Sequence, residues 1–335
     1  MKAIVLAGAG GPEVLEEQDR PLPAPGHQQV RIRVHASALN RADLHQRMGN
    51  YPAPPGSPAD IPGMEYSGEV DALGDAGTMW HVGDRVMGIV GGGAHAEFLC
   101  AHEREVIAMP KGMSFTDAAA IPEVFLTAWD ALFARLSVQM GERVLVHAVG
   151  SGVGTAALQL ANLAGAIVVG TSRTKDKLVK AESLGLVHGV DTSAGEWAVQ
   201  VEALIGTNGI HAVVDLVGGD YLAGNLRVMA PRGRMLVVGL TAGRSAPLNL
   251  GMVLAKRLHI EGTMLRGRPI EEKIALAQDF SSRVVPLFES HQLRPVIDDV
   301  IPFANIRAAH ERLASGETFG KLVLTWSAHA SLHSG

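Results

Sequence analysis

The sequence predicts an α/β protein whose second half forms a parallel β-sheet covered by helices. From Arg143 onward, short runs of Val, Ile and Leu alternate with amphipathic helical stretches, and this alternation is typical of successive βαβ units. The 335 residues include 39 Gly but only 4% aromatic residues, which indicates an aliphatic core and many turns. The residues before this region read as short strands separated by turns, so a mainly β part precedes the sheet.

In this first part, up to about residue 120, proline-rich segments at 21–26 and 52–58 exclude helices. Ser114 and Asp117 have the spacing of a capping box, which predicts a short helix over Asp117–Ile121 that Pro122 interrupts. Alternating apolar residues predict strands over Ala3–Leu6, Val30–Ala38, Tyr66–Leu73, Arg85–Ile89 and His95–Leu99.

The second part alternates between strands and helices, and the chain then returns to the first part. A helix over Ile270–Glu289, interrupted by Pro286, and a last strand over Lys321–Trp326 make that return, and the small polar tail after Trp326 is expected to fray. The strands are expected over Arg143–Val149, Ala166–Thr171, Ala212–Leu216 and Met235–Leu240, and the helices over Thr155–Ala164, Lys175–Leu184, Trp197–Ile205 and Tyr221–Met229.

Composition and charge exclude several classes of function. The formal net charge is -5 and no run of Lys and Arg exceeds two residues, so we expect no nucleic-acid partner. The apolar runs are strand-sized, far below the ~20 residues that cross a bilayer, so we expect no membrane partner. No cleavage-like region follows the N-terminal apolar run, which favours a cytoplasmic protein. The single cysteine, Cys100, excludes an internal disulfide and a cysteine-rich zinc site.

A glycine-rich turn joins the strand that starts at Arg143 to the helix that follows it. Such a turn aims the first backbone N–H groups of the helix at one point, where they can bind a pyrophosphate. The spacing departs from the strict G-x-G-x-x-G pattern, and glycine-rich turns also serve as ordinary connections. The order of strand, turn and helix within a βαβ series favours a nucleotide site. The turn consists of Gly150, Ser151, Gly152, Val153 and Gly154.

The end of the next strand indicates the type of nucleotide. NAD sites place an acidic residue there for the ribose 2′-hydroxyl, whereas NADP sites supply cations for the 2′-phosphate. This strand ends at Ser172 and Arg173, with Lys177 one helical turn further and no acid at the turn. We therefore favour NADPH, although both cations could instead be solvated side chains at a helix start.

Five segments, at 38–52, 61–68, 82–86, 118–123 and 151–157, resemble the medium-chain dehydrogenase/reductase superfamily in sequence and in order. Within it the chain is most similar to the zinc-independent NADPH quinone oxidoreductases of the p53-inducible type. The resemblance implies a GroES-like, partly open β-barrel catalytic domain, a Rossmann doubly wound parallel sheet, and a cleft between them. It assigns residues 1–122 to the catalytic domain, 123–262 to the NADP-binding Rossmann domain, and 263–335 to the return and the C-terminal tail.

The resemblance also argues against a catalytic metal. The positions that hold Cys, His and Cys ligands in zinc alcohol dehydrogenases correspond to Asn40, Met64 and the neighbourhood of Glu123. A neutral amide and a thioether replace strong ligands there, so three good zinc donors cannot be assembled. His45 and His95 are expected to be surface or core histidines. Without a Lewis acid, hydride transfer suits a quinone or conjugated enone, whose negative charge is delocalised.

The resemblance places three candidate catalytic residues near the substrate. Asn40 would lie beside the nicotinamide end of the cofactor, Asp43 would orient loop groups, and Tyr51 could donate a proton to the substrate oxygen. Structural roles are open for both Tyr51, as a loop residue that covers the barrel, and Asn40, as a turn-stabilising side chain. The resemblance also assigns to the cofactor Asn40 itself, Thr127, Val217, Gly218, Leu240, Thr241, Thr263, Met264, Leu265 and Lys321. Thr192 stands where the family often has a Tyr that holds the 2′-phosphate, which leaves more of that phosphate to Arg173 and Lys177.

The leading hypothesis is an NADPH-dependent quinone oxidoreductase that acts on a small-molecule quinone or enone. The alternatives are an enone or enoyl reductase of the same superfamily and a non-catalytic NADPH-binding sensor. By family analogy we expect a homodimer, formed through an edge strand of the Rossmann sheet near Pro247–Met252.

Overall fold

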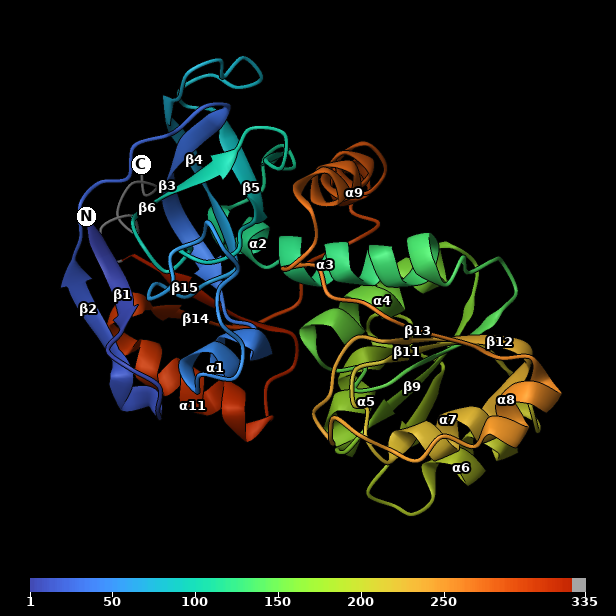
Figure 1. The fold of residues 1–335 in the computed structure, drawn as a ribbon. Helices are drawn as coiled ribbons and strands as arrows, with labels where there is room; N and C mark the ends of the chain where they lie inside the picture. The colour runs from blue at the N-terminus through green and yellow to red at the C-terminus, as the bar shows by residue number, and fades with distance from the viewer. Residues whose placement is uncertain (327–335) are drawn as a thin grey trace. The chain divides into compact units, whose positions relative to one another are not determined.

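The computed structural model describes residues 1–326, so the tail expected to fray lies outside the described residues. The chain divides into two compact units (Figure 1), and each is described by itself. The first unit consists of Met1–Leu126 together with the residues from Leu265 onward, and the second consists of Thr127–Met264. No helix within the described residues is both long and apolar enough to cross a bilayer.

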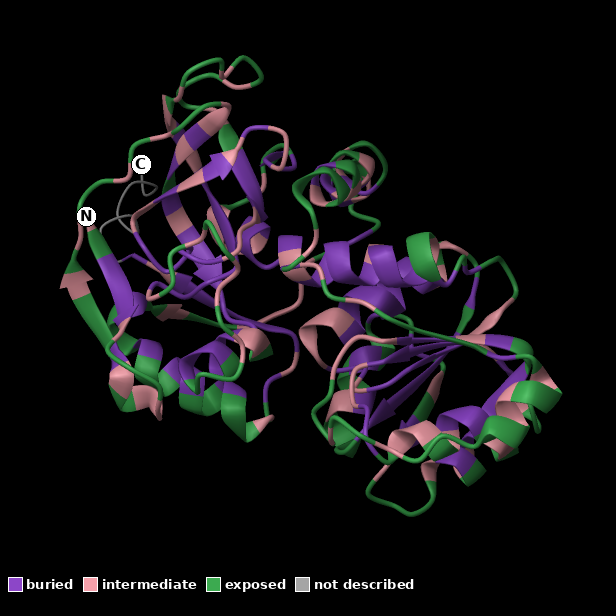
Figure 2. Ribbon diagram, in the orientation of Figure 1, coloured by how far each residue is buried: buried purple, intermediate pink, exposed green. Residues whose placement is uncertain are grey.

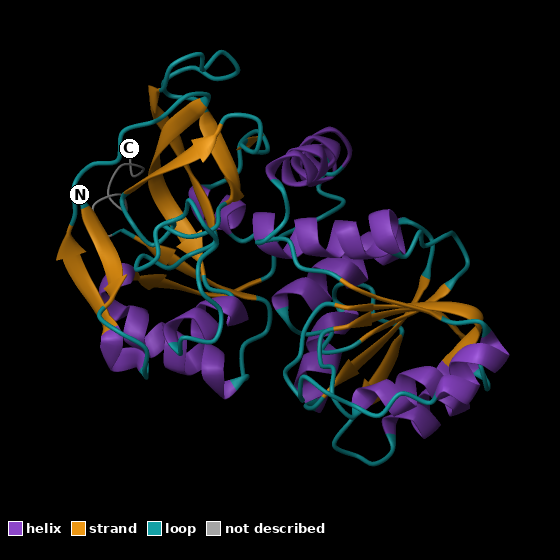
Figure 3. Ribbon diagram, viewed as in Figure 1, coloured by secondary structure: helices purple, strands orange, loops and turns teal. Residues whose placement is uncertain are grey.

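The first unit contains a seven-stranded sheet and a separate antiparallel pair (Figure 3). The pair is β1 (Lys2–Leu6) and β2 (Leu15–Asp19). The sheet has the order β14-β15-β3-β4-β5-β7, with β6 also paired to β3. Its strands are β3 (Gln29–Ala38), β4 (Glu65–Leu73), β5 (Arg85–Ile89), β6 (Phe98–His102), β7 (Ile107–Ala108), β14 (Ile297–Pro302) and β15 (Lys321–Thr325).

Short helices and loops surround this sheet. Helix α1 begins directly after Asn40, and α11 packs near it. The helices are η1 (Pro12–Val14), α1 (Arg41–Arg47), α2 (Phe115–Ala119), α3 (Pro122–Trp129, which continues into the second unit), α9 (Ile270–Arg283), α10 (Val285–Glu289), η3 (Phe303–Asn305) and α11 (Ile306–Ser315).

The second unit is built on a six-stranded sheet of order β10-β9-β8-β11-β12-β13. Every neighbouring pair is parallel. Helices α6, α7 and α8 cover one face and α4 the other (Figure 1). The strands are β8 (Arg143–Val146), β9 (Ile167–Ser172), β10 (His188–Asp191), β11 (Ile210–Asp215), β12 (Met229–Val237) and β13 (His259–Gly262). The helices are η2 (Asp130–Arg135), α4 (Gly152–Leu163), α5 (Lys175–Glu182), α6 (Trp197–Ile205), α7 (Tyr221–Val228) and α8 (Leu250–Lys256).

Each unit has its own aliphatic core, as the low aromatic content predicts (Figure 2). In the second unit the central strands are buried on both faces, which explains their continuous Val and Leu runs. The predicted α/β class, with a mainly β unit and a parallel-sheet unit, is confirmed.

Several expected boundaries need correction. Pro122 begins α3 instead of only interrupting a helix, because its fixed φ suits the first helical turn. The helix expected over Ile270–Glu289 breaks at Val284, and Pro286 lies in the first turn of α10. The segment Pro247–Met252 leads into α8 and contains no strand, and the edge strand of the sheet is β13.

Candidate functional site

A buried polar network lies in the first unit, where Asn40 precedes α1 and where β4 and β15 begin. The Lys321 ammonium forms an ion pair with Glu65 Oε1 at 2.7 Å and donates a hydrogen bond to Asn40 Oδ1 at 2.6 Å. The Asn40 amide nitrogen donates to the same Glu65 oxygen at 2.8 Å. Glu65 is 0% exposed and Lys321 3% exposed, so both charges depend on these bonds instead of on water.

The remaining bonding positions of this network are also occupied. Lys321 donates to the carbonyl oxygen of Leu39 at 2.7 Å, and the backbone N–H of Glu123 donates to Glu65 Oε2 at 2.9 Å. The three N–H donors of the ammonium therefore each have an intramolecular acceptor. Lys321, a predicted cofactor residue, thus fixes the position of the Asn40 side chain by a hydrogen bond to its amide oxygen.

Asp43 connects α1 to the loop before β4. Its Oδ2 accepts from the backbone N–H of Asn40 at 2.8 Å and its Oδ1 accepts from that of Gly63 at 3.2 Å. The carboxyl is fully buried, and burial raises its pKa against the opposing effect of the bond from Asn40. Gly63 has φ +94°, and a Cβ there would lie 2.5 Å from the backbone nitrogen of His95. Asp43 therefore bonds to backbone groups at the start of α1 and before β4, and its role in catalysis stays a prediction.

Tyr51 lies half-buried in the loop after α1. The guanidinium carbon of Arg266 lies 5.0 Å from the centre of its ring. Burial raises the pKa of the Tyr51 phenol, and the nearby Arg266 charge opposes only part of that effect. The phenol is therefore protonated at neutral pH and can donate a hydrogen bond or a proton.

The positions that the resemblance assigns to a catalytic zinc do not suit a metal. Asn40 Oδ1 already accepts from an ammonium at 2.6 Å, so a metal bound to this oxygen would lie beside a buried cation. Met64 is a buried thioether, which is a poor zinc ligand. Within residues 1–326, no group of three or more His, Cys, Asp or Glu side chains is arranged to hold a metal ion.

In the second unit, the glycine-rich turn leads from β8 into the N-terminus of α4. Ser151 caps the helix, and its side chain accepts from the backbone N–H of Gly154 at 3.1 Å. A Cβ on Gly154 would lie 2.4 Å from the carbonyl oxygen of Ala148, so only glycine allows helix and strand to approach this closely. The first turn of α4 presents backbone N–H groups and the positive end of the helix dipole, which suit a pyrophosphate.

A buried network shapes the neighbouring loop after β11. Asp215 Oδ1 accepts from the backbone N–H groups of Val217 and Gly218, both at 2.9 Å. Asn225 donates to Asp215 Oδ2 at 3.1 Å, and its own oxygen bonds to His147 at 2.7 Å. These bonds fix the Val217–Gly218 turn, one of the predicted cofactor segments.

Cations follow the end of β9. Arg173 is exposed and Lys177 is half-buried in the first turn of α5, while Asp176 pairs with Lys180 at 2.8 Å. The Thr192 hydroxyl donates to the Ser172 carbonyl oxygen at 3.3 Å. This end of β9 therefore presents more positive than negative charge, which suits a 2′-phosphate.

The parallel sheet brings most of the predicted cofactor residues to one edge, because each segment follows the carboxyl end of a strand. Thr263 follows β13, and its hydroxyl donates to Asp130 at 2.9 Å. Two other predicted cofactor residues do not follow a strand of this sheet: Thr127 is buried in α3, and Leu265 belongs to the first unit. The segments at the edge are Gly150–Gly154, Ser172–Arg173, Val217–Gly218, Leu240–Thr241 and Thr263–Met264.

Sequence reasoning missed Glu65, Arg266, His147 and Asp215. Glu65 directly follows Met64 in one of the segments on which the resemblance rests, so an acidic residue at the end of an apolar stretch was an available signal. Arg266 bonds to residues more than 200 positions away, and no local pattern indicates that contact.

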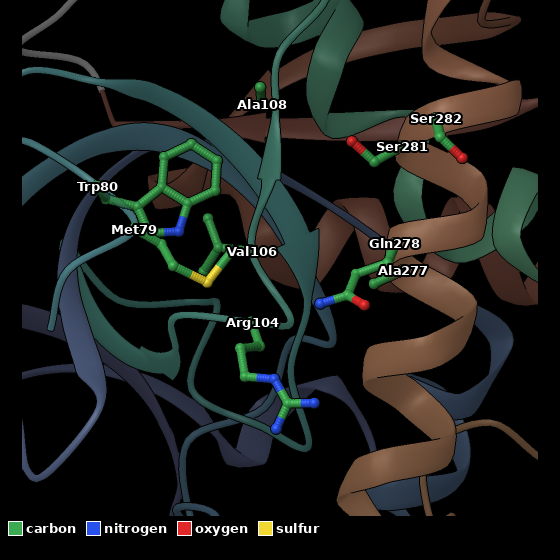
Figure 4. A pocket seen from close by; sticks show the side chains of 9 residues that line it. All are labelled: Met79, Trp80, Arg104, Val106, Ala108, Ala277, Gln278, Ser281 and Ser282. Carbon is green, nitrogen blue, oxygen red and sulfur yellow. The ribbon is translucent and has the colours of Figure 1, made fainter.

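A separate pocket of about 310 Å³ opens in the first unit between the segment at Met79 and Trp80 and helix α9 (Figure 4). Trp80, Met79 and Val106 line one side, and Ala277 and Gln278 the other. None of the candidate site residues lines this pocket.

Two family models match the chain. Residues 26–111 match the alcohol dehydrogenase GroES-like domain, and residues 152–282 match the zinc-binding dehydrogenase family. A quinone oxidoreductase from Pseudomonas aeruginosa is 34% identical over 328 residues, covering 96% of this chain and 99% of that protein.

Solved structures agree with this fold. A structure described as an NAD-dependent alcohol dehydrogenase has a TM-score of 0.85 at 34% identity, covering 97% of this chain and 99% of its own. The CurK enoyl reductase has a TM-score of 0.86 at 28% identity, with the same coverage of 97% and 99%. The chain therefore belongs to the medium-chain dehydrogenase/reductase superfamily of nicotinamide-dependent oxidoreductases, within its quinone oxidoreductase family.

Proposed function

We propose that the protein transfers a hydride from NADPH to a quinone or similar conjugated carbonyl without zinc. The observation that supports this proposal is the Lys321–Glu65–Asn40 network, which bonds the Asn40 side chain, at a position that the resemblance assigns to a zinc ligand, to an internal ion pair. A site without a Lewis acid suits acceptors whose developing negative charge is delocalised. The cytoplasmic location remains a prediction from the sequence.

The second unit would hold the cofactor. The N-terminus of α4 suits the pyrophosphate, and Arg173 with Lys177 suits the 2′-phosphate. NADPH supplies the hydride when bound, and the chain binds and orients it. The Val217–Gly218 turn, fixed by Asp215, would form part of that channel.

The first unit would bind and protonate the acceptor. Tyr51 donates the proton that the reduced substrate oxygen needs, while Asp43 and Lys321 hold Asn40 at the floor of the site. Because the Asn40 side chain already bonds to Glu65 and Lys321, it acts here as a fixed polar surface for the nicotinamide end.

Cofactor choice is tested by measuring the affinity for NADPH and NADH in the wild type and in Arg173→Ala. Loss of a charge-assisted contact is expected to reduce the preference for NADPH by about 1–3 kcal/mol. Glu182→Ala, a change at the far end of the helix α5 that follows Arg173, serves as the control and should leave the ratio unchanged. An unchanged ratio in Arg173→Ala would contradict the assignment of the 2′-phosphate site.

A second candidate is an enoyl reductase, which the structural likeness to the CurK enoyl reductase favours. It shares the cofactor and the hydride geometry, so substrate comparison must separate the two. A steady-state assay with 1,4-benzoquinone and with a crotonyl-type enone tests them directly. Tight NADPH binding with oxidation by neither acceptor would instead indicate a non-catalytic NADPH sensor.

We also propose a homodimer that forms through β13. This edge strand is exposed along its whole length, and Leu250 and Leu254 on the adjacent α8 are 70% and 80% exposed. Such an edge is commonly covered by the same strand of a second copy. Sedimentation should give a dimer for the wild type and a monomer for Leu254→Glu, whereas a monomeric wild type would contradict the proposal.

A further inference from the structure

Arg266 is a buried cation that joins three segments of the first unit. Its Nε donates to the carbonyl oxygen of Gly91 at 2.8 Å, and its two terminal nitrogens donate to Tyr51 O at 3.3 Å and to Gln46 Oε1 at 2.7 Å. The residue is 6% exposed. A guanidinium has a rigid planar fork, so these bonds fix the place of the Tyr51 backbone relative to α1 and the Gly91 turn.

Among residues 1–326, no carboxylate forms a recorded hydrogen bond or ion pair with Arg266. Each hydrogen-bond acceptor recorded for it in the described part of the chain is a neutral oxygen, two from the main chain and one from an amide. Burial lowers the pKa of Arg266, and Asp43 and Tyr51 oppose that effect through space. A desolvated cation without a contacting carboxylate attracts nearby negative charge more strongly than a paired one.

Arg266 also determines the orientation of the Gln46 side-chain amide. The amide oxygen of Gln46 faces the guanidinium, and its amide nitrogen is buried without a hydrogen-bond partner in the structure. Leaving a buried amide N–H unbonded is costly, so the bond to Arg266 decides which way the side chain points.

The Tyr51 ring is the group that this cation faces. The guanidinium carbon lies 5.0 Å from the ring centre, within the range of a cation–π contact. The same arginine therefore holds Tyr51 by its backbone and by its ring.

We propose that Arg266 is a positioning residue that fixes Tyr51 and stabilises the negative charge left on this side chain after proton transfer. This inference rests on the proposed function of Tyr51 as the proton donor. After hydride delivery the substrate carries a negative oxygen. The O–H bond of Tyr51 breaks, an O–H bond forms on the substrate, and the electron pair stays on the tyrosinate, whose ring the guanidinium faces. Water then returns a proton to Tyr51.

A double-mutant cycle with Tyr51→Phe and Arg266→Met tests whether Arg266 acts through Tyr51. With Tyr51 present, Arg266→Met should lower kcat for quinone reduction about 10-fold or more, with a smaller change in KM. In the Tyr51→Phe background the same substitution should change kcat less than about 3-fold, because there is no phenol to position. Losses of equal size in both backgrounds would overturn the proposal and indicate a structural role.

Two further variants separate charge from geometry and from stability. Arg266→Lys keeps the charge and should restore part of the lost kcat. Arg85→Met removes a guanidinium that lies 4.5 Å from the Phe115 ring and bonds to the Met113 carbonyl oxygen, so it is a matched control that should leave kcat unchanged. A loss of kcat in Arg85→Met as large as that in Arg266→Met would count against a specific role.

A spectroscopic measurement tests the same claim without turnover. The chain has only 3 Tyr residues, so Tyr51→Phe identifies the Tyr51 signal in carbon NMR of the labelled phenol. Removing the Arg266 charge should raise the pKa of the Tyr51 phenol, because the nearby cation lowers it. An unchanged Tyr51 titration in folded Arg266→Met would overturn the proposal even if no quinone is reduced, whereas a shifted titration without turnover would contradict only the proposed function.

Discussion

The two units hold their polar groups in opposite ways. In the first unit, Asn40, Glu65 and Lys321 bond to one another below the surface, and Glu65 has no exposure to water. In the second unit, the first turn of α4 and the exposed Arg173 present donors at the edge of the sheet. The difference teaches that the polar network of the first unit is organised before any ligand binds, whereas the second unit presents donors that suit an incoming anion.

The largest expected effect comes from breaking the ion pair of the first unit. Lys321→Met leaves the Glu65 carboxylate buried without its cation, and we expect a loss of about 3–5 kcal/mol in the free energy of unfolding by urea. Adding Glu65→Gln should restore part of the loss, since no buried charge remains. A loss below about 1 kcal/mol in the single variant would mean that water or another group compensates the Glu65 carboxylate, and it would contradict a network sealed from solvent.

The pH dependence of stability tests a second feature of the first unit, its buried histidines. Burial lowers the pKa of His95 and of His310 to about 3, from an ordinary value of 6.5. Their contribution to stability is complete above pH 6.5. It falls as the pH drops toward 3, because the unfolded chain takes up protons that the folded chain excludes.

The expected slope is about 1.4 kcal/mol per pH unit for each imidazole in this window. Urea unfolding of the wild type and of His310→Gln at several pH values measures it. The variant should show a shallower decline than the wild type between pH 6.5 and 3. Parallel curves would show that His310 is not held neutral in the folded protein.

A smaller effect is expected in the second unit. Asn225→Ala removes the bonds to Asp215 and His147, which should cost about 1–3 kcal/mol of stability and weaken NADPH binding through the Val217–Gly218 turn. The control is Asn162→Ala near the C-terminal end of α4, which removes bonds to the main-chain oxygens of Leu184 and Gly185. Equal NADPH affinities in the two variants would show that the Asp215–Asn225–His147 network does not contribute to cofactor binding.

How much the sequence predicts differs along the chain for physical reasons. Helix α6 matches the expected range Trp197–Ile205, because its apolar face packs on the sheet and produces a clear period. Strand β13 escaped prediction because all of its residues are exposed at an edge and have no apolar pattern. Helix α1 escaped because it is a short, polar segment that starts at the Asn40 cap.

The residues of the candidate site also differ in how far the sequence predicts them. Asn40, Asp43 and Tyr51 lie close together in sequence within a family motif, so sequence reasoning could single them out. Lys321 and Arg266 reach this region from the end of the chain, and their contacts depend on how β15 and the segment before α9 return to the first unit. Tertiary folding creates those contacts, and no spacing rule encodes them.

Oxidation of NADPH by 1,4-benzoquinone, before and after treatment of the purified protein with a strong zinc chelator, tests the central claim most directly. The account predicts steady turnover that the chelator leaves unchanged, since the Lys321 ammonium already bonds to Asn40 Oδ1. Activity that the chelator abolishes and added zinc restores would contradict it.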